Sequence, residues 1–201
     1  YRAGGAMASN DTLAIAVHGV QTHGAMPWRG VDSIVVASQI VLGLQTIASR
    51  QLDVTLAPSI ITLGSIHGGV RPNITPDRVD MVGTIRTFDE GQRDEIHRRI
   101  KATADSIAAA SGARAEVTIT RGYPVTVNDP ALTDRMMATL RRVAGQDKVV
   151  AVPPTTTSED FSYFAQKAPG LFLFLGVTPA GQDADKAAPN HSPRFFADEG
   201  A

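Results

Sequence analysis

The sequence predicts an α/β (α+β) protein: a two-layer βαββαβ domain followed by a second, smaller α/β unit. Three observations support this prediction. Residues 12–18 and 79–88 alternate apolar and polar side chains, as half-buried strands do. Apolar residues recur at helical spacing in the segments that follow each of these strands. Beyond residue 122 the pattern changes, and short apolar runs alternate with loops rich in Pro, Thr and Gly.

The first half of the predicted domain starts at residue 12. Leu13, Ile15 and Val17 fall on one face of the first strand. A loop with the sequence QTHGAMPWRG follows, and Asp32 or Ser33 is placed to cap a helix that runs to residue 50. Residues 59–66 are rich in β-branched side chains and predict the second strand.

The second half repeats the order of strand and helix. After the strand at 79–88, Asp89 is placed to cap a helix that stops at Gly112, and residues 114–122 predict the last strand. This βαββαβ order is the ferredoxin-like, or split βαβ, plan. One sheet with two helices on one face makes a self-sufficient layer pair, so we expect residues 12–121 to form a domain.

The C-terminal segment, 122–201, predicts fewer elements. We expect a helix at 131–144, a short strand at 148–152, a short helix that Ser158 caps, and a buried strand at 171–177. Two strands and two helices bury little apolar surface, so we expect this segment to be part of a larger α/β domain. Residues 1–11, which begin on Tyr1 rather than Met, then read as a hinge from the same domain, and the chain as a fragment.

Composition excludes several functional classes. The chain has 201 residues, a net charge of −1 and no Cys. We therefore expect no nucleic-acid partner, no disulfide and no thiolate metal site. An uninterrupted run of about 18 apolar residues is absent, so we expect no membrane partner. The motifs of serine hydrolases, zincins, P-loop enzymes and dinucleotide-binding proteins are also absent.

Three residues of the first domain are candidates for chemistry. His23 follows a strand in a Gly-rich loop, and either bonds the backbone or polarises a carbonyl. Asn73, in RPNITP, either shapes a turn or contacts substrate. Arg86 lies on a strand among apolar neighbours, and its planar fork of donors suits a carboxylate.

The C-terminal segment adds further candidates. Glu159 and Asp160 either favour a helix N-terminus or act as catalytic carboxylates. His191 lies between Asn190 and Ser192 in a loop, which suits a rigidly presented metal ligand. The remaining histidines read as incidental; these are His18, His67 and His97.

Six motifs in order carry a resemblance to a known family: THGAMPWRGVD, GGVRPNITPD, GTIRTFD, YPVTVND, SEDFSYF and NHSPRF. Together they resemble the metal-dependent aminoacylase and carboxypeptidase family, in particular its amidohydrolase branch. That branch contains N-acyl-amino-acid amidohydrolases and hippurate hydrolases. The resemblance covers essentially the whole chain.

The resemblance implies a catalytic α/β domain that holds two divalent metal ions, zinc or manganese, with a βαββαβ lid domain inserted in it. On this pattern residues 12–121 are the lid, which mediates homodimerisation, and residues 122–201 are the C-terminal part of the catalytic domain. The earlier part, with the other metal ligands and the catalytic glutamate, would lie before Tyr1. With a single candidate ligand, this fragment would bind the metals weakly or not at all.

The resemblance also implies a role for each candidate residue. His23 would polarise the scissile carbonyl across the dimer, and Asn73 would contact the substrate. Arg86 would bind the substrate carboxylate, also across the dimer, and His191 would be the last metal ligand. The substrate would be an N-acyl amino acid or a related small amide. Glu159 and Asp160 receive no catalytic step.

Two other functions stay open. The chain as given either belongs to such an amidohydrolase or is a non-catalytic dimerisation fragment of one. A third alternative is a regulatory module that binds a small molecule, since one fold supports many functions, but a fixed loop histidine argues against it. We expect a soluble protein, cytoplasmic rather than periplasmic.

Overall fold

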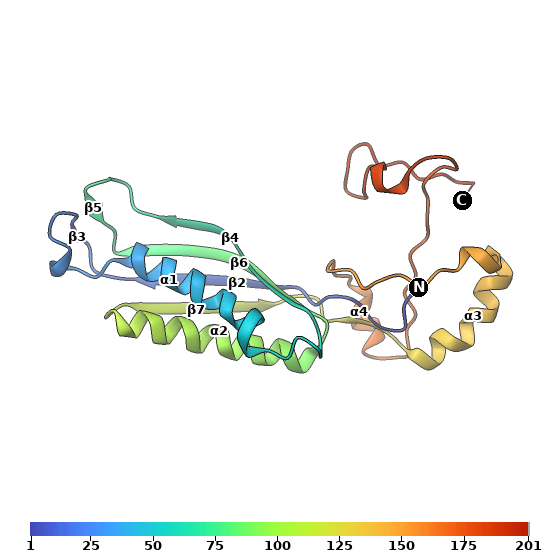
Figure 1. The fold of residues 1–201 in the computed structure, drawn as a ribbon, viewed down its shortest axis with the longest axis horizontal. Coiled ribbons are helices and arrows are strands. Elements are labelled where there is room, and N and C mark those ends of the chain that lie inside the picture. The colour runs from blue at the N-terminus through green and yellow to red at the C-terminus, as the bar shows by residue number, and fades with distance from the viewer. Residues whose placement is uncertain (201) are drawn as a thin grey trace.

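A computed structural model of the protein describes residues 1–200 (Figure 1). The molecule is elongated. A sheet covered by two helices forms one part, and the N-terminal strand lies with the C-terminal segment in the other (Figure 1). The division into domains at residues 12 and 121 stays a prediction, although the sheet itself spans residues 11–121.

The main sheet has the strand order β4-β6-β2-β7, and every neighbouring pair is antiparallel. Its strands are β2 (Asp11–His18), β4 (Ser59–Gly68), β6 (Arg78–Thr87) and β7 (Arg114–Arg121). This is the strand order of the split βαβ plan, so the predicted antiparallel sheet with helices is confirmed. β2 lies at the centre, where Leu13 pairs with Gly83 on one side and Ile119 on the other.

Both predicted caps of the two long helices are present. α1 (Ser33–Thr46) begins at Asp32, whose carboxylate accepts hydrogen bonds from the amides of Ile34 and Val35. α1 continues into a π-helical turn, η2 (Ile47–Gln51). α2 (Glu90–Ala110) begins at Asp89 and ends where Gly112 adopts a left-handed conformation, with φ of 72°.

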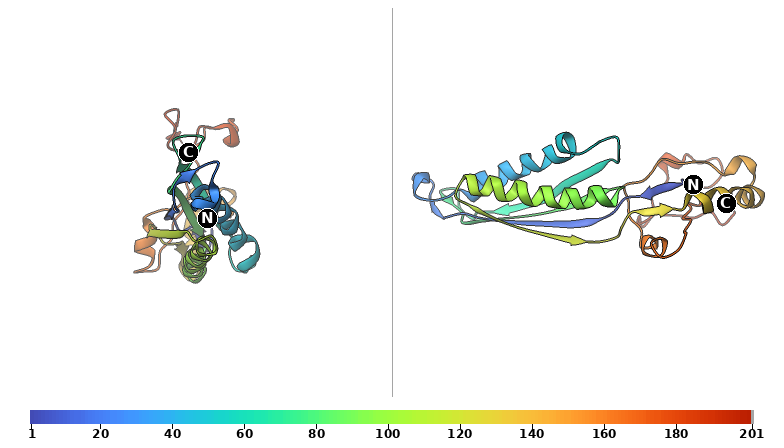
Figure 2. Two further views of the ribbon diagram at one scale, coloured as in Figure 1. Left: turned by 90° about the vertical axis from the view of Figure 1, so that its left-hand side faces the viewer. Right: turned by 90° about the horizontal axis from the view of Figure 1, so that it is seen from below.

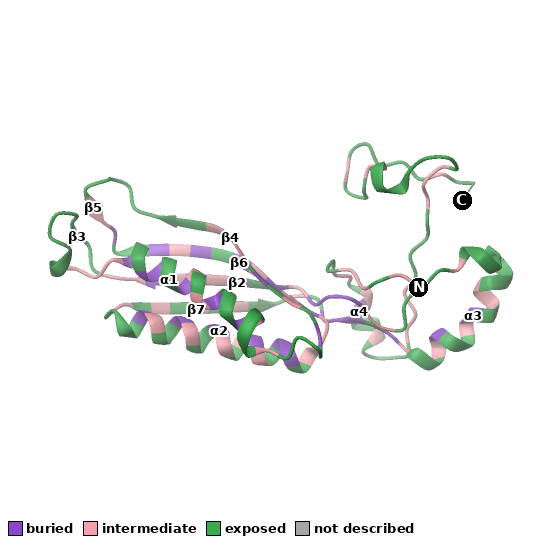
Figure 3. Ribbon diagram, in the orientation of Figure 1, coloured by how far each residue is buried: buried purple, intermediate pink, exposed green. Residues whose placement is uncertain are grey.

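The core lies between the sheet and these two helices, which cover the same face of the sheet (Figures 2 and 3). Ser33–Gln51 has the length and composition of a membrane-spanning helix. In this fold its apolar character serves the core, because Val36, Ile40 and Leu44 pack against the sheet. The opposite face of the sheet carries no helix (Figure 2).

A small two-stranded ribbon forms the far end of the molecule, which we call the tip (Figure 1). It pairs β3 (Thr22–His23) with β5 (Ile74–Thr75), and a 3-10 turn, η1 (Pro27–Arg29), follows β3. Neither short strand was predicted from the sequence, because each is only two residues long.

The other end contains a second ribbon and two helices. β1 (Gly4–Met7) pairs with β8 (Thr126–Asn128), and neither strand was predicted. α3 (Pro130–Ala144) agrees with the predicted helix, and Asp129 caps it through the amide of Leu132. The short elements that follow are η3 (Gln146–Lys148), α4 (Phe161–Ala165) and η4 (Ala184–Lys186).

Three predictions for this end are wrong. Residues 148–152 and 171–177 form no strand, and Ser158 does not cap α4, which begins at Asp160 without a side-chain cap. The segment expected to be buried is open, with 78% of Leu175 exposed. A strand needs a partner, and Phe172 is held instead by the Asn128 side chain, which bonds its amide and its carbonyl.

Candidate functional site

His23 and Asn73 lie together at the tip. The antiparallel pairing of β3 with β5 sets His23 opposite Ile74, the residue after Asn73. The Gly24 amide donates to the Asn73 carbonyl over 2.8 Å. Both side chains are exposed. The structure therefore joins two predicted site residues that lie 50 positions apart in the chain.

The His23 ring is fixed by its own loop. Its Nδ1 accepts a hydrogen bond from the Ala25 amide at 3.0 Å, and its carbonyl accepts one from the Met26 amide at 2.8 Å. Because Nδ1 acts as an acceptor, the ring proton lies on Nε2. Nε2 is thereby a hydrogen-bond donor at the exposed end of the molecule, which is the form required to bind a developing oxyanion.

Large apolar residues in the loops at this end of the molecule are exposed. Trp28 is 77% exposed and Val70 is 94% exposed, and Met26 is also exposed. Large apolar side chains gathered at one end of a molecule are typical of a surface that another molecule covers. We therefore expect another molecule to cover the tip.

Arg86 lies at the opposite end of β6 from the tip. Its Nη1 donates to the Thr156 carbonyl at 2.9 Å. Arg78 to Arg86 spans eight strand residues, or about 26 Å. Within one chain, Arg86 is therefore too far from His23 and Asn73 to bind the same small molecule. The expectation that His23 and Arg86 of one copy both reach the same substrate across the dimer is wrong.

The candidates of the C-terminal segment do not form a metal site by themselves. His191 is exposed and left-handed, with φ of 74°, so its loop does hold an unusual conformation. Glu159 accepts hydrogen bonds from Ser162 through its carbonyl, at the start of α4. Among residues 1–200, no group of three or more His, Asp or Glu side chains is arranged to hold a metal ion.

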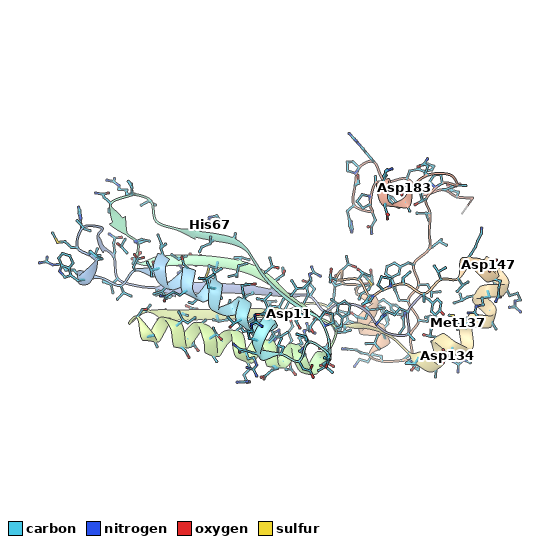
Figure 4. All side chains as sticks on the ribbon, in the orientation of Figure 1. Asp11, His67, Asp134, Met137, Asp147 and Asp183 are labelled. Carbon is cyan, nitrogen blue, oxygen red and sulfur yellow. The ribbon has the colours of Figure 1, made fainter. Side chains whose placement is uncertain are left out.

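Sequence reasoning missed a buried ionic cluster where the sheet meets the C-terminal segment. We call it the junction cluster; its members are Asp11, Glu90, Arg93 and His97 (Figure 4 labels Asp11). Asp11 is fully buried and Arg93 is 2% exposed. Arg93 binds the Asp11 carboxylate through both Nε and Nη2, and His97 Nε2 lies 2.6 Å from Asp11 Oδ2. The prediction that His97 is incidental is wrong.

The cluster keeps Asp11 charged. Burial raises the pKa of Asp11, but the hydrogen bonds from Arg93 and His97 and the Arg93 charge outweigh it, so that this pKa lies well below its usual range. A lowered carboxylate pKa stabilises the folded state above the unfolded pKa of about 4, and this contribution is lost as the pH falls further. Removing one partner of such a pair typically costs about 3–5 kcal/mol, because the other charge stays buried.

The sequence did contain a signal for this cluster. Asp11 falls in the inward alternation of Leu13, Ile15 and Val17, where a carboxylate is out of place unless it is paired. Arg93 follows Glu90 at a spacing of three, and His97 follows Arg93 at a spacing of four, on the helix face that carries Ile96 and Ile100. When a strand and a helix each carry a charged residue at an inward-facing position, and the charges are opposite, an ion pair between the two elements is predicted.

Most of the part of the chain that forms the main sheet and its helices matches a known protein family. Residues 9–111 match the family model of the M20 peptidase dimerisation domain. The chain belongs to the M20 peptidase and amidohydrolase family. The resemblance seen in the motifs is thereby confirmed.

Relatives of this M20 chain include several named hydrolases. Thermostable carboxypeptidase 2 of Saccharolobus solfataricus is 38% identical over 98% of this chain and 49% of its own length. N-acetyl-L-cysteine deacetylase of Bacillus subtilis is 36% identical over 100% of this chain and 46% of its own length. The chain spans about half the length of the curated relatives it matches.

Solved structures agree. A putative aminohydrolase from methicillin-resistant Staphylococcus aureus superposes with a TM-score of 0.86 at 28% identity, over 100% of this chain and 49% of that one. A Bacillus subtilis protein described as a dinuclear metal-binding peptidase of the M20 family gives a TM-score of 0.76 at 28% identity, over 100% of this chain and 48% of its own. The M20 family thus includes dinuclear metal peptidases.

The fixed His23 ring leads to a spectroscopic prediction. We expect long-range proton–nitrogen NMR spectra above pH 8 to show the Nε2–H tautomer of His23 as the dominant form, because the Ala25 amide occupies Nδ1. Ala25→Pro removes that donor and should lower the share of this tautomer. A dominant Nδ1–H signal in the unsubstituted protein would contradict the assignment.

Proposed function

We propose that this chain supplies the dimerisation lid and part of the catalytic domain of a metal-dependent amidohydrolase. The substrate class is N-acyl amino acids or related small amides and peptides. One observation carries the proposal: an exposed histidine at the tip offers its Nε2–H beside Asn73. Membership of a hydrolase family whose named relatives include a carboxypeptidase and a deacetylase supports it.

The residues of this chain would bind and orient the substrate. Nε2 of His23 would donate to the carbonyl oxygen of the scissile amide as negative charge develops there. Asn73, beside it, would contact the same part of the substrate. The guanidinium of Arg86 would hold the free carboxylate of the amino-acid half and so fix the amide relative to His23.

Two metal ions do not fit the residues of this chain alone. Catalytic zinc sites typically use three protein ligands, and the chain offers His191 as a single candidate. We propose that His191 contributes to a site whose other ligands belong to the half of the relatives' length that this chain does not span. That half would also contribute the base that accepts the proton of the attacking water.

The geometry calls for a second copy of the chain. His23 and Asn73 lie at the tip, whereas Arg86 and the loop at 155–158 lie at the opposite end of β6. A substrate that contacts both groups would have to lie between the tip of one copy and the far end of its partner. Dimerisation therefore completes the proposed site rather than merely stabilising it.

β4 is the edge that suits such pairing. It contains no Asp, Glu, Lys or Arg, so it lacks the charges that normally protect an edge strand. α1, which contacts β4, also carries exposed apolar residues, among them Leu42, which is 70% exposed. The other edge, β7, carries Arg114, Glu116 and Arg121. We propose that two copies pair through β4 and α1.

Activity tests the proposed roles directly. In the full gene product that contains these residues, we expect His23→Ala to lower kcat on an N-acetyl amino acid by about 10²–10³, because one oxyanion donor is lost. His191→Ala should abolish turnover and reduce the bound metal measured by atomic spectroscopy. His18→Ala, which changes a histidine beside Glu116 on the open sheet face, serves as the control and should stay within about twofold. A near-normal rate in either test variant would remove that residue from the mechanism.

An assay of the 201-residue chain alone distinguishes the alternative, a non-catalytic lid fragment, from a chain that is active by itself. We expect no turnover of N-acetyl amino acids with added zinc or manganese, since a single ligand does not hold a metal pair. Isothermal titration should show no tight zinc site. Metal-stimulated hydrolysis by the chain alone would contradict the ligand assignment.

Sedimentation tests the proposed interface. At micromolar concentration we expect a dimer that Thr62→Lys, on β4, converts to monomer, because a charge at the centre of an edge strand opposes pairing. Thr118→Lys provides a matched control, since this exposed threonine lies on the opposite edge strand, β7. Dissociation by Thr118→Lys instead would place the interface at β7. A monomeric unsubstituted chain would exclude both.

A further inference from the structure

The junction cluster lies where the chain passes between the two parts of the molecule. The chain enters the main sheet through residues 8–11 and leaves it through residues 121–125. Asp11 is the first residue of β2, and Gly122 directly follows β7. Every covalent path from the sheet to the C-terminal segment therefore runs past the Asp11 carboxylate (Figure 4).

Side chains from the start of β2 and the first turn of α2 bind the chain where it leaves the main sheet, at residues 122–125. Asp11 Oδ1 accepts from the Gly122 amide at 3.1 Å, and Arg93 Nη2 donates to the Gly122 carbonyl at 3.3 Å. Glu90 Oε1 accepts from the Val125 amide at 2.9 Å while its carboxylate also binds Arg93 Nη1. Three charged side chains thus bind the backbone of residues 122–125.

The same segment is tied to the incoming strand. The Gly122 amide also donates to the Asn10 carbonyl at 2.9 Å, and the Asn10 amide donates to the Tyr123 carbonyl at 3.0 Å. A Cβ atom at Gly122 would lie 2.3 Å from the Asn10 carbonyl oxygen, so only glycine permits this approach. The Ser9 amide in turn donates to the Thr87 carbonyl at 2.8 Å.

These contacts extend to the proposed site. Ala8 donates to the Thr155 carbonyl at 3.2 Å, and Thr155 donates back to the Ala6 carbonyl at 3.0 Å. The next residue, Thr156, accepts the hydrogen bond from Arg86. The loop at 155–158 thus follows the incoming strand, which the junction cluster fixes relative to β6.

We infer that Asp11, Glu90, Arg93 and His97 are positioning residues that set the angle between the main sheet and the C-terminal segment. A flexible hinge would need few contacts across it, whereas here the buried Asp11 and Arg93 and the partly exposed Glu90 bind both crossing strands. The cluster holds one relative orientation, and with it the distance from Arg86 to the loop at 155–158. This inference concerns the chain itself and stands whether or not the chain takes part in hydrolysis.

A distance measurement between two spin labels tests the inference. The chain has no Cys, so Lys101→Cys on α2 and Arg142→Cys on α3 would be its only thiols. Both positions are exposed. We expect a single narrow distance distribution at pH 7. In Asp11→Asn with Arg93→Gln, which leaves no unpaired buried charge, the distribution should broaden at least twofold while the main sheet still unfolds cooperatively.

A second variant and a second readout cover the case in which that pair fails to fold. Glu90→Ala changes a partly exposed side chain, 43% exposed, and removes the anchor of the Val125 amide. We expect it to broaden the distribution and to raise hydrogen exchange at Gly122 and Val125 more than tenfold. Arg98→Gln is the matched control, because Arg98 forms an exposed pair with Glu95 on the same helix. It should leave both readouts unchanged.

Two results would overturn the inference. One is a distribution in Glu90→Ala, or in the double variant, as narrow as that of the unsubstituted chain. The other is equal broadening by Arg98→Gln, which would show that any loss of charge on α2 loosens the junction. The first result would count even if the variant lost thermal stability, since a merely structural pair would lower stability without broadening the distribution.

Discussion

The alternation of β2 is the constraint on which the rest of the structure depends. This strand is central, and it pairs with β6 and β7 along its whole length. Leu13, Ile15 and Val17 point into the core beneath the helices, and Asp11 continues the same alternation at the strand's start. One strand therefore contributes both to the apolar core, from Leu13 onward, and to the buried ion pair, through Asp11 two residues before Leu13. A slip of one residue would expose the former and leave Arg93 without its partner.

The helices bury only one face of the main sheet, and this determines which of its surfaces remain available for contact. Two helices cover a single face of the four-stranded sheet, so the sheet keeps an open face and two edges (Figure 2). Charges occupy β7 and are absent from β4. Of the two edges, β4 is therefore the one that lacks charged side chains to oppose pairing with another strand.

Local patterns predicted the elements whose stability is local. Asp32, Asp89 and Gly112 bound their helices as expected, because caps act within one turn. The apolar runs at 148–152 and 171–177 gave wrong strand predictions. An apolar run forms a buried strand only if a neighbouring strand is available to pair with it, and the local sequence does not show whether one is. The tip depended on register: His23 meets Asn73 only through the pairing of β3 with β5. The neighbours of Arg86 predict a polar partner such as a carboxylate, whereas its separation from the tip follows from the length of β6.

That length makes the junction important. A rotation of about 10° at the junction cluster would move a tip about 26 Å away by roughly 5 Å. Catalytic groups tolerate displacements of about 1 Å before the rate falls steeply. Under the proposed function, a long, thin domain that presents His23 at its far end needs a stiff base, and buried charges with directional hydrogen bonds supply stiffness that apolar contacts alone do not. Asp11 and Arg93 lie at the base of the sheet rather than near the tip, and stiffness at the base has the greatest effect on the position of the tip.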